Sequence, residues 1–270
     1  MVRAASPKRA AARARPVVIW HDLECGLYTA DLELWRELAR AHAAGGEPIL
    51  EIGAGTGRVS IDLARRGHAV TALERDPILL AALAERATGL DVAAVGGDAR
   101  AFKLARSDYA LCLVPMQTVQ LMGGRAGRLA FLRAVRAHMC DRGVLACALV
   151  EEIEPFDADR EALQLEPELA RHEGVLYSSR PTRVSVGRWR IRIELERHVE
   201  RGDQQPGAEP QPGVEPDPGE QPEREVIELD RLTAERLQQE AALVGLRALE
   251  VRSVSPTELH TASTVVILGA

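Results

Sequence analysis

Hydrophobic and polar positions follow two alternating periods between residues 49 and 150. Short apolar runs of strand length are each followed by a stretch with apolar residues at helical spacing. The apolar runs are 48–53, 69–74, 91–98, 109–115 and 143–150, and the helical stretches are 58–67, 76–87 and 128–143. Strands that are apolar throughout are buried on both faces, as in a parallel sheet between two helix layers. The pattern therefore predicts an α/β fold with a doubly wound sheet over residues 49–150.

The flanking segments predict further elements. Residues 29–46 carry an apolar stripe at helical spacing, with Thr29 or Asp31 as the N-cap, and Asp76 before Pro77 should cap the helix 76–87. Polar and apolar residues alternate from 175 to 200, which predicts a half-exposed antiparallel hairpin. The remaining expectations are a strand at 224–230, a helix at 232–246, and two last strands at 247–255 and 263–270.

Two segments lack the apolar residues that a core needs. Residues 1–16 hold five basic side chains and no acid, and we expect a disordered basic tail there, although its composition also resembles a transit peptide. Residues 202–223 contain six prolines, four glycines and six acids but no base. This stretch predicts a disordered acidic loop.

Composition and charge narrow the classes of partner. The net charge is −6 and aromatic residues make up 3% of the chain, which argues against nucleic-acid binding through phosphate contacts or base stacking. The longest apolar run, 144–150, is far shorter than the ~18 residues of a membrane span, so no membrane partner is expected. The four cysteines lack CxxC spacing, which favours a reducing, cytoplasmic location and predicts no metal site.

The stretch "ILEIGAGTGR" (49–58) contains the residues that we expect to bind a ligand. A strand that turns through glycines into a helix presents backbone N–H groups and the positive helix end to a ligand. A P-loop lysine is missing, and a dinucleotide-binding GxGxxG motif would require glycine where Arg58 stands. Glu51 precedes the glycines and would repel phosphate but attract a cation. The turn therefore predicts a ligand with positive charge and no phosphate nearby.

The pattern E-x-G-x-G-x-G resembles that of class I S-adenosylmethionine (SAM)-dependent methyltransferases of the small-molecule type, similar to methyltransferase domain 25. The resemblance implies that the turn holds the amino-acid and sugar portions of SAM, whose product is S-adenosylhomocysteine. It implies an acid at the second strand's end for the ribose hydroxyls, an acid after the third strand near adenine, and a loop after the fourth strand beside the methyl group. The cofactor-binding residues implied are Tyr28, Glu51, Gly53, Ala54, Gly55, Gly57, Glu74, Arg75, Asp98, Ala99, Val114 and Pro115.

The same resemblance implies a Rossmann-like, seven-stranded, mostly parallel sheet with a reversed last strand, plus a small antiparallel β insertion. It divides the chain after the tail into lid helices at 17–48, a SAM-binding core at 49–150, a substrate-side insertion at 151–231, and a C-terminal helix with two strands at 232–270.

The expected reaction is transfer of the SAM methyl group to an oxygen or nitrogen of a small molecule by in-line displacement. His21, Gln117 and Glu151 are the catalytic candidates, because each lies near a predicted strand end or the lid. The loop after the fourth strand reads Val114-Pro115-Met116-Gln117, unlike the Asn/Asp-Pro-Pro-aromatic turn of the related nucleic-acid amino-methylating enzymes. A small-molecule acceptor is therefore expected, and a homodimer is compatible with the sequence.

Two alternatives remain open at this point. A nicotinamide-dependent oxidoreductase shares the strand-glycine-helix arrangement, although Arg58 and Glu51 argue against it. A non-catalytic SAM-binding interaction protein would use the basic tail and the acidic loop as docking segments. Binding of NAD would support the first, and cofactor binding without methyl transfer would support the second.

Overall fold

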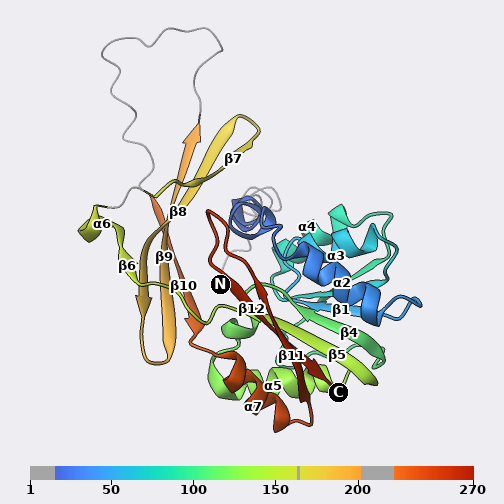
Figure 1. Cartoon of the computed structure of the whole chain (residues 1–270). Helices are drawn as coiled ribbons and strands as arrows, with labels where there is room; N and C mark the ends of the chain where they lie inside the picture. The colour runs from blue at the N-terminus through green and yellow to red at the C-terminus, as the bar shows by residue number, and fades with distance from the viewer. Residues whose placement is uncertain (1–15, 163–164, 202–221) are drawn as a thin grey trace, which may run out of the picture. The chain divides into compact units, whose positions relative to one another are not determined.

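The computed structural model describes residues 16–162, 165–201 and 222–270. Most of the predicted disordered tail and acidic loop lie outside these ranges. The chain forms two compact units, which we describe separately (Figure 1). The Rossmann-like unit comprises Tyr28–Ile153, Gly187–Arg190 and Leu229–Ala270, and the insertion unit comprises Met1–Leu27, Glu154–Val186 and Ile191–Glu228.

The Rossmann-like unit is built on a seven-stranded sheet with the order β11-β12-β5-β4-β1-β2-β3. β12 pairs antiparallel with both β5 and β11, and the other neighbouring pairs are parallel. The predicted fold class, with its reversed last strand, is confirmed. The strands are β1 (Ile49–Ile52), β2 (Val70–Glu74), β3 (Val92–Gly96), β4 (Tyr109–Val114), β5 (Met139–Leu149), β11 (Arg247–Val254) and β12 (Ser263–Gly269).

Helices cover both faces of this sheet, because alternate residues of each central strand point to opposite sides. On β1, Leu50 and Ile52 belong to a buried cluster that also contains side chains of α5 and α7, whereas Ile49 belongs to a second cluster with side chains of α2 and α3. These two clusters explain why the strands are apolar throughout. The helices are α2 (Leu32–His42), α3 (Arg58–Ala64), α4 (Pro77–Arg86), α5 (Gly124–Arg136) and α7 (Ala234–Ala242).

Local signals placed most of these elements correctly. The Asp76 carboxylate accepts hydrogen bonds from Ile78 N and Leu79 N, so the predicted cap of α4 is confirmed. α5 begins at Gly124, four residues before the predicted start, and β5 begins at Met139 rather than Gly143. Part of this difference reflects the irregular pairing of β5 with β4, whose register shifts between Tyr109 and Leu111.

The insertion unit contains an antiparallel sheet. The predicted hairpin is present as β8 (Val175–Val186) and β9 (Arg190–Arg201), and β10 (Glu223–Asp230) pairs with β9. Three short elements were not predicted: β6 (Phe156–Asp157), α6 (Ala158–Glu161) and β7 (Glu168–His172). The π-helix η1 (Asp22–Gly26) lies within the region predicted as lid helices. Within the ranges that the structure describes, no helix has the length and apolar character needed to cross a membrane.

Candidate active site

The strand order of the sheet reverses direction at β1. β1 lies between β2 and β4, and the chain leaves it toward β2 on one side while β4 returns on the other. Ligands of open α/β sheets bind outside the carboxyl ends of the strands at such a reversal of strand order. Both the glycine turn after β1 and the loop after β4 lie at this edge.

The glycine turn adopts backbone conformations that other residues rarely tolerate. Gly53, Gly55 and Gly57 have φ values of +73°, +55° and +97°. A Cβ atom on Gly53 would lie 2.8 Å from the Thr118 Oγ1 atom, so the loop after β4 packs directly against the turn. Gly53 N and Ala54 N both donate to Leu73 O, at 2.9 and 3.1 Å, and thereby fix the turn to β2.

Glu74 is held in place at the end of β2 by backbone donors. Its Oε2 atom accepts a hydrogen bond from Gly55 N at 2.8 Å, and its Oε1 atom accepts from Arg75 N and Asp76 N, both at 2.8 Å. The half-buried carboxylate is therefore oriented before any ligand arrives. A fixed acceptor beside a glycine turn suits a vicinal diol, which offers two hydroxyl donors.

Glu51 lies beneath the turn rather than on its surface. Only 2% of the residue is exposed, and its carboxylate forms a close hydrogen bond with the buried Ser60 hydroxyl on α3. Burial raises the pKa of Glu51 to about 7, although Ser60 and Arg58 oppose the shift. Its predicted attraction of a cation would therefore act from within the protein and would depend on its ionisation.

Asp98 follows β3 at the same edge of the sheet. Arg100 donates to its carboxylate from both the backbone N and the guanidinium, and these contacts lower the pKa of Asp98 to about 2. Arg75 lowers it further through its charge, so the ends of β2 and β3 lie near each other. Ala99 packs against the hydrophobic core.

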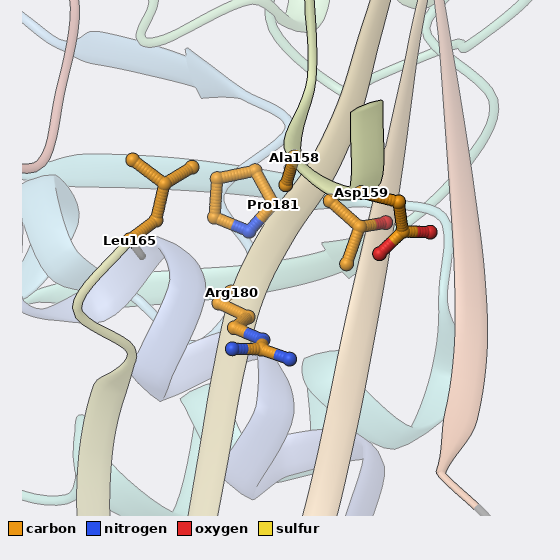
Figure 2. Close-up of a pocket in the computed structure, with 6 residues that line it drawn as sticks. Ala158, Asp159, Leu165, Arg180 and Pro181 are labelled. Carbon is orange, nitrogen blue, oxygen red and sulfur yellow. The ribbon is translucent and has the colours of Figure 1, made fainter. Parts of the chain in front are cut away.

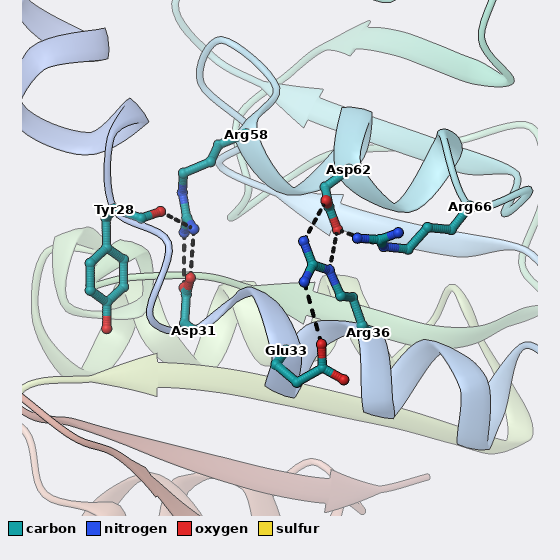
Figure 3. Close-up of polar contacts among 7 residues, drawn as sticks. All are labelled: Tyr28, Asp31, Glu33, Arg36, Arg58, Asp62 and Arg66. Atoms are coloured by element: carbon teal, nitrogen blue, oxygen red, sulfur yellow. Dashed lines mark hydrogen bonds and ion pairs between the residues drawn. The ribbon is translucent and has the colours of Figure 1, made fainter.

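The segment before α2 is fastened to the helix that follows the glycine turn (Figure 3). Arg58 donates to both Asp31 carboxylate oxygens, at 2.5 and 2.9 Å, and to the Tyr28 carbonyl oxygen at 2.8 Å. Asp31 also accepts from Trp35 Nε1 at 2.7 Å. Asp31 is the N-cap residue of α2, one of the two candidates predicted, but its side chain makes no capping hydrogen bond, because its carboxylate binds Arg58 and Trp35 instead.

The loop after β4 contains a strained backbone. Val114 and Pro115 are buried, and Met116 adopts a left-handed φ of +54° although it is not glycine. Such conformations cost energy and are concentrated at functional sites. The next residue, Gln117, is half-buried at the start of the short helix η2 (Thr118–Leu121). Gln117 thus directly precedes Thr118, the residue that packs against the glycine turn.

Two polar residues near this edge have structural roles. Gln120 exchanges hydrogen bonds with the backbone of Val150 and donates to Asp230 O at 2.9 Å. Both oxygens of Glu151 are engaged, one by Ala234 N at 2.7 Å and the other by the Thr264 hydroxyl at 2.8 Å. Glu151 thus joins α7 and β12 to the end of β5, and its catalytic role stays a prediction.

Comparison with known proteins agrees with this geometry. A family model described as a methyltransferase domain matches residues 49–143. These residues form a methyltransferase domain. The match spans the glycine turn, Glu74, Asp98 and the loop after β4.

The relatives of the methyltransferase domain differ in what they act on. Ribosomal RNA small subunit methyltransferase A of Deinococcus radiodurans is 40% identical over 106 residues, covering 37% of this chain and 36% of the relative. The chain thus matches about a third of that curated protein. SAM-bound CalS10, an amino pentose methyltransferase from Micromonospora echinaspora, has a TM-score of 0.66 at 20% identity, with 100% and 98% of the two chains covered. The sugar N-methyltransferase KedS8 from Streptoalloteichus has a TM-score of 0.61 at 18% identity, with 99% and 94% covered. These structural likenesses establish a class I methyltransferase fold.

The insertion unit contains the remaining predicted site residue, His21, at the end of a helical segment that precedes η1. His21 thus belongs to a different unit from the glycine turn, and its catalytic role stays a prediction. A pocket in the insertion unit is lined by Ala158, Asp159, Leu165, Arg180, Pro181 and Thr182 (Figure 2). Its volume of about 50 Å³ is small beside the roughly 300–1,000 Å³ of small-molecule sites, and it includes none of the predicted site residues.

Several residues at the edge of the methyltransferase domain were missed from the sequence. Thr118 and the left-handed Met116 lie in the loop that was predicted beside the methyl group, but their individual roles were not predicted. A buried network joins Arg128 to Asp230 at 2.6 Å and to Glu240 at 2.7 Å, across more than 100 residues of sequence. Arg128 is a polar residue on an otherwise apolar stripe of its helix, and that position is the one sequence signal that it is buried.

Proposed function

We propose that this protein is a SAM-dependent methyltransferase whose acceptor is a small molecule with an amine. The observation that carries the proposal is the contact between Gly55 N and the Glu74 carboxylate, which sets a fixed acid beside a glycine turn at the carboxyl edge. A nicotinamide-dependent oxidoreductase is less well supported, because Arg58 occupies the position of the third glycine and is buried in an ion pair.

The residues present fit SAM. The left-handed glycines bring bare backbone close to the ligand, and Glu74 would hold the ribose hydroxyls. Asp98, kept ionised by Arg100, would accept a hydrogen bond from the adenine amino group. Tyr28, fixed by Arg58 at the start of α3, would cover the amino-acid end.

When bound, SAM would supply a methyl group activated by its positively charged sulfonium sulfur. The protein's own contribution is alignment and exclusion of water, which in the best cases lowers the barrier by roughly 7–11 kcal/mol. The loop 114–118 packs against the glycine turn and would define the acceptor side. Gln117, half-buried in that loop, would orient the acceptor through its amide.

The preference for an amine acceptor draws support from two solved structures with similar whole-chain folds, an amino pentose methyltransferase and a sugar N-methyltransferase. A second candidate is methylation of ribosomal RNA, which the 40% identity over 106 residues to an RNA enzyme favours. The net charge of −6 speaks against it, because RNA binding draws most of its affinity from basic side chains.

Calorimetric titration of the full chain with S-adenosylhomocysteine, beside NAD, tests the cofactor. Binding of the first alone supports the proposal, and binding of NAD alone would replace it with the oxidoreductase. Transfer of a labelled methyl group from SAM is then compared between a panel of amino sugars and small ribosomal subunits. Labelling of the RNA without labelling of any amine would overturn the small-molecule assignment.

A further inference from the structure

Gln120 is a buried glutamine on η2, the short helix that follows β4, and only 1% of the residue is exposed. Its Nε2 atom donates to Val150 O at 3.0 Å and to Asp230 O at 2.9 Å. Its Oε1 atom accepts from Val150 N at 2.8 Å. Both N–H groups of the carboxamide thus bind backbone oxygens, and these bonds fix the position of the side chain.

The two residues that Gln120 binds stand beside the two ends of the main insertion segment. That segment begins after Ile153, shortly beyond Val150, and the chain continues in the Rossmann-like unit from Leu229, the residue before Asp230. All of the residues that make these contacts belong to the Rossmann-like unit. One carboxamide therefore ties the exit and the return of the chain to the loop after β4.

Asp230 is itself held firmly. It is 5% exposed, and its Oδ2 atom accepts from Gly124 N and from Arg128 Nη1, both at 2.6 Å. Arg128 in turn binds Glu240 on α7. The carbonyl group that accepts from Gln120 is thus anchored to α5 and, through Arg128, to α7. Gln120 is therefore bound to a fixed point of the fold.

The backbone of η2 carries this fixed position into the loop after β4. Gln120 N donates to Gln117 O at 2.8 Å. On the other side of the loop, Thr118 packs so closely on the glycine turn that a Cβ atom on Gly53 would lie 2.8 Å from Thr118 Oγ1. Met116 between them keeps a left-handed φ of +54°, a conformation that persists only where the surroundings hold it. The loop is therefore held between the glycine turn and Gln120.

We infer that Gln120 is a positioning residue for methyl transfer, which sets Gln117 and the loop after β4 against the methyl group of SAM. The inference rests on the proposed function, because it requires SAM to bind at the glycine turn with its methyl group beside this loop. In this role Gln120 acts through the backbone of the loop and touches neither the cofactor nor the acceptor. Its loss should change recognition at the methyl position and leave binding of the rest of the cofactor intact.

The test uses sinefungin, a SAM analogue that carries a primary ammonium in place of the sulfonium methyl, and S-adenosylhomocysteine, which lacks that group. Affinities of the full chain for both are measured by calorimetry. Gln120→Met keeps the length of the side chain but loses all three side-chain hydrogen bonds. It should lower the ratio of sinefungin affinity to S-adenosylhomocysteine affinity by about fivefold or more, because the loop no longer holds its polar groups at the ammonium. Affinity for S-adenosylhomocysteine should stay within about twofold of wild type.

Gln120→Glu is the second variant, because it keeps the shape but sets an oxygen against the carbonyl oxygens of Val150 and Asp230. It should lower the ratio at least as far. Glu240→Gln is the matched control for lost stability, since Glu240 binds Arg128 in the adjoining buried network. It should lower the free energy of unfolding in urea and keep the wild-type ratio.

The outcomes separate positioning from stability and from the cofactor assignment. A wild-type ratio in either Gln120 variant would overturn the inference. An equal fall of the ratio in Glu240→Gln would also overturn it, because the effect would then follow stability alone. Failure of the wild type to bind S-adenosylhomocysteine would instead overturn the proposed function.

Discussion

Arg58 and Asp31 form a buried two-point ion pair, with the Arg58 nitrogens 2.5 and 2.9 Å from the two carboxylate oxygens of Asp31. Arg58 is the first residue of α3, immediately after the glycine turn, and Asp31 precedes α2. The side chains are 10% and 3% exposed. The pair therefore fastens the segment that carries Tyr28 to the turn, and it explains why arginine stands where a dinucleotide-binding motif has glycine.

Removing one partner of this pair should destabilise the fold strongly. Asp31→Asn leaves the Arg58 charge buried without its counter-ion, and we expect a loss of about 3 kcal/mol in the free energy of unfolding. Glu33→Gln is the matched control, because Glu33 contacts Arg36 and Arg40 on the exposed surface of α2 and should cost under ~0.5 kcal/mol. Urea unfolding of both variants checks this, and equal effects would show that the buried pair is not important for stability.

Gly53→Ala should be destabilising for two separable reasons. The left-handed φ of +73° costs an alanine about 1–2 kcal/mol, and the new Cβ also overlaps Thr118, whose Cγ2 atom would lie 2.5 Å away. Gly67 has a φ of +89° but nothing within 4 Å of its Cβ position. Gly67→Ala should therefore show the conformational cost alone.

A double-mutant cycle distinguishes these two costs. Adding Thr118→Ala should restore part of the stability lost by Gly53→Ala, and it should add independently to Gly67→Ala. The measurement is urea unfolding of all five variants. Strict additivity of Gly53→Ala and Thr118→Ala would mean that the loop after β4 does not pack on the turn.

The sequence predicted the sheet and the turn because their signals are local. Apolar runs, Asp76 with Pro77, and glycines at every second position each state a backbone preference within a few residues. The contacts of Glu151 and Arg58 could not be predicted in this way, because their partners lie 83 and 27 residues away. An acid after a strand looks the same whether it faces a ligand or receives the N-terminal N–H of α7, and only the assembled fold distinguishes the two.

Glu51 should make stability depend on pH. Its pKa is raised from 4.5 to about 7 by burial, so between these values the native state holds a proton that the unfolded chain has lost. The free energy of unfolding should therefore decrease as pH rises from 4.5 to 7, by up to about 3 kcal/mol from this group. Glu51→Gln keeps an acceptor for Ser60 and removes the titration.

The comparison of wild type with Glu51→Gln isolates this effect. Glu168 in the insertion unit also has a pKa raised to about 7 by burial, so both proteins retain that contribution. Urea unfolding at a series of pH values should give two curves that converge near pH 4.5, with wild type the less stable protein near pH 8. Parallel curves would contradict the raised pKa of Glu51.

Glu74 should determine affinity for any ligand that carries the ribose diol. Glu74→Ala removes two charge-assisted hydrogen bonds and the fixation of Gly55 N, so we expect binding of S-adenosylhomocysteine to weaken at least about 100-fold. 5′-Methylthioadenosine has the same ribose but no amino-acid end, and its affinity should fall by the same factor. Glu85→Gln, on the exposed face of α4, is the control and should leave both affinities unchanged. If calorimetry shows a loss for S-adenosylhomocysteine alone, Glu74 contacts the amino-acid end instead, and the orientation of the cofactor along the turn would have to be reversed.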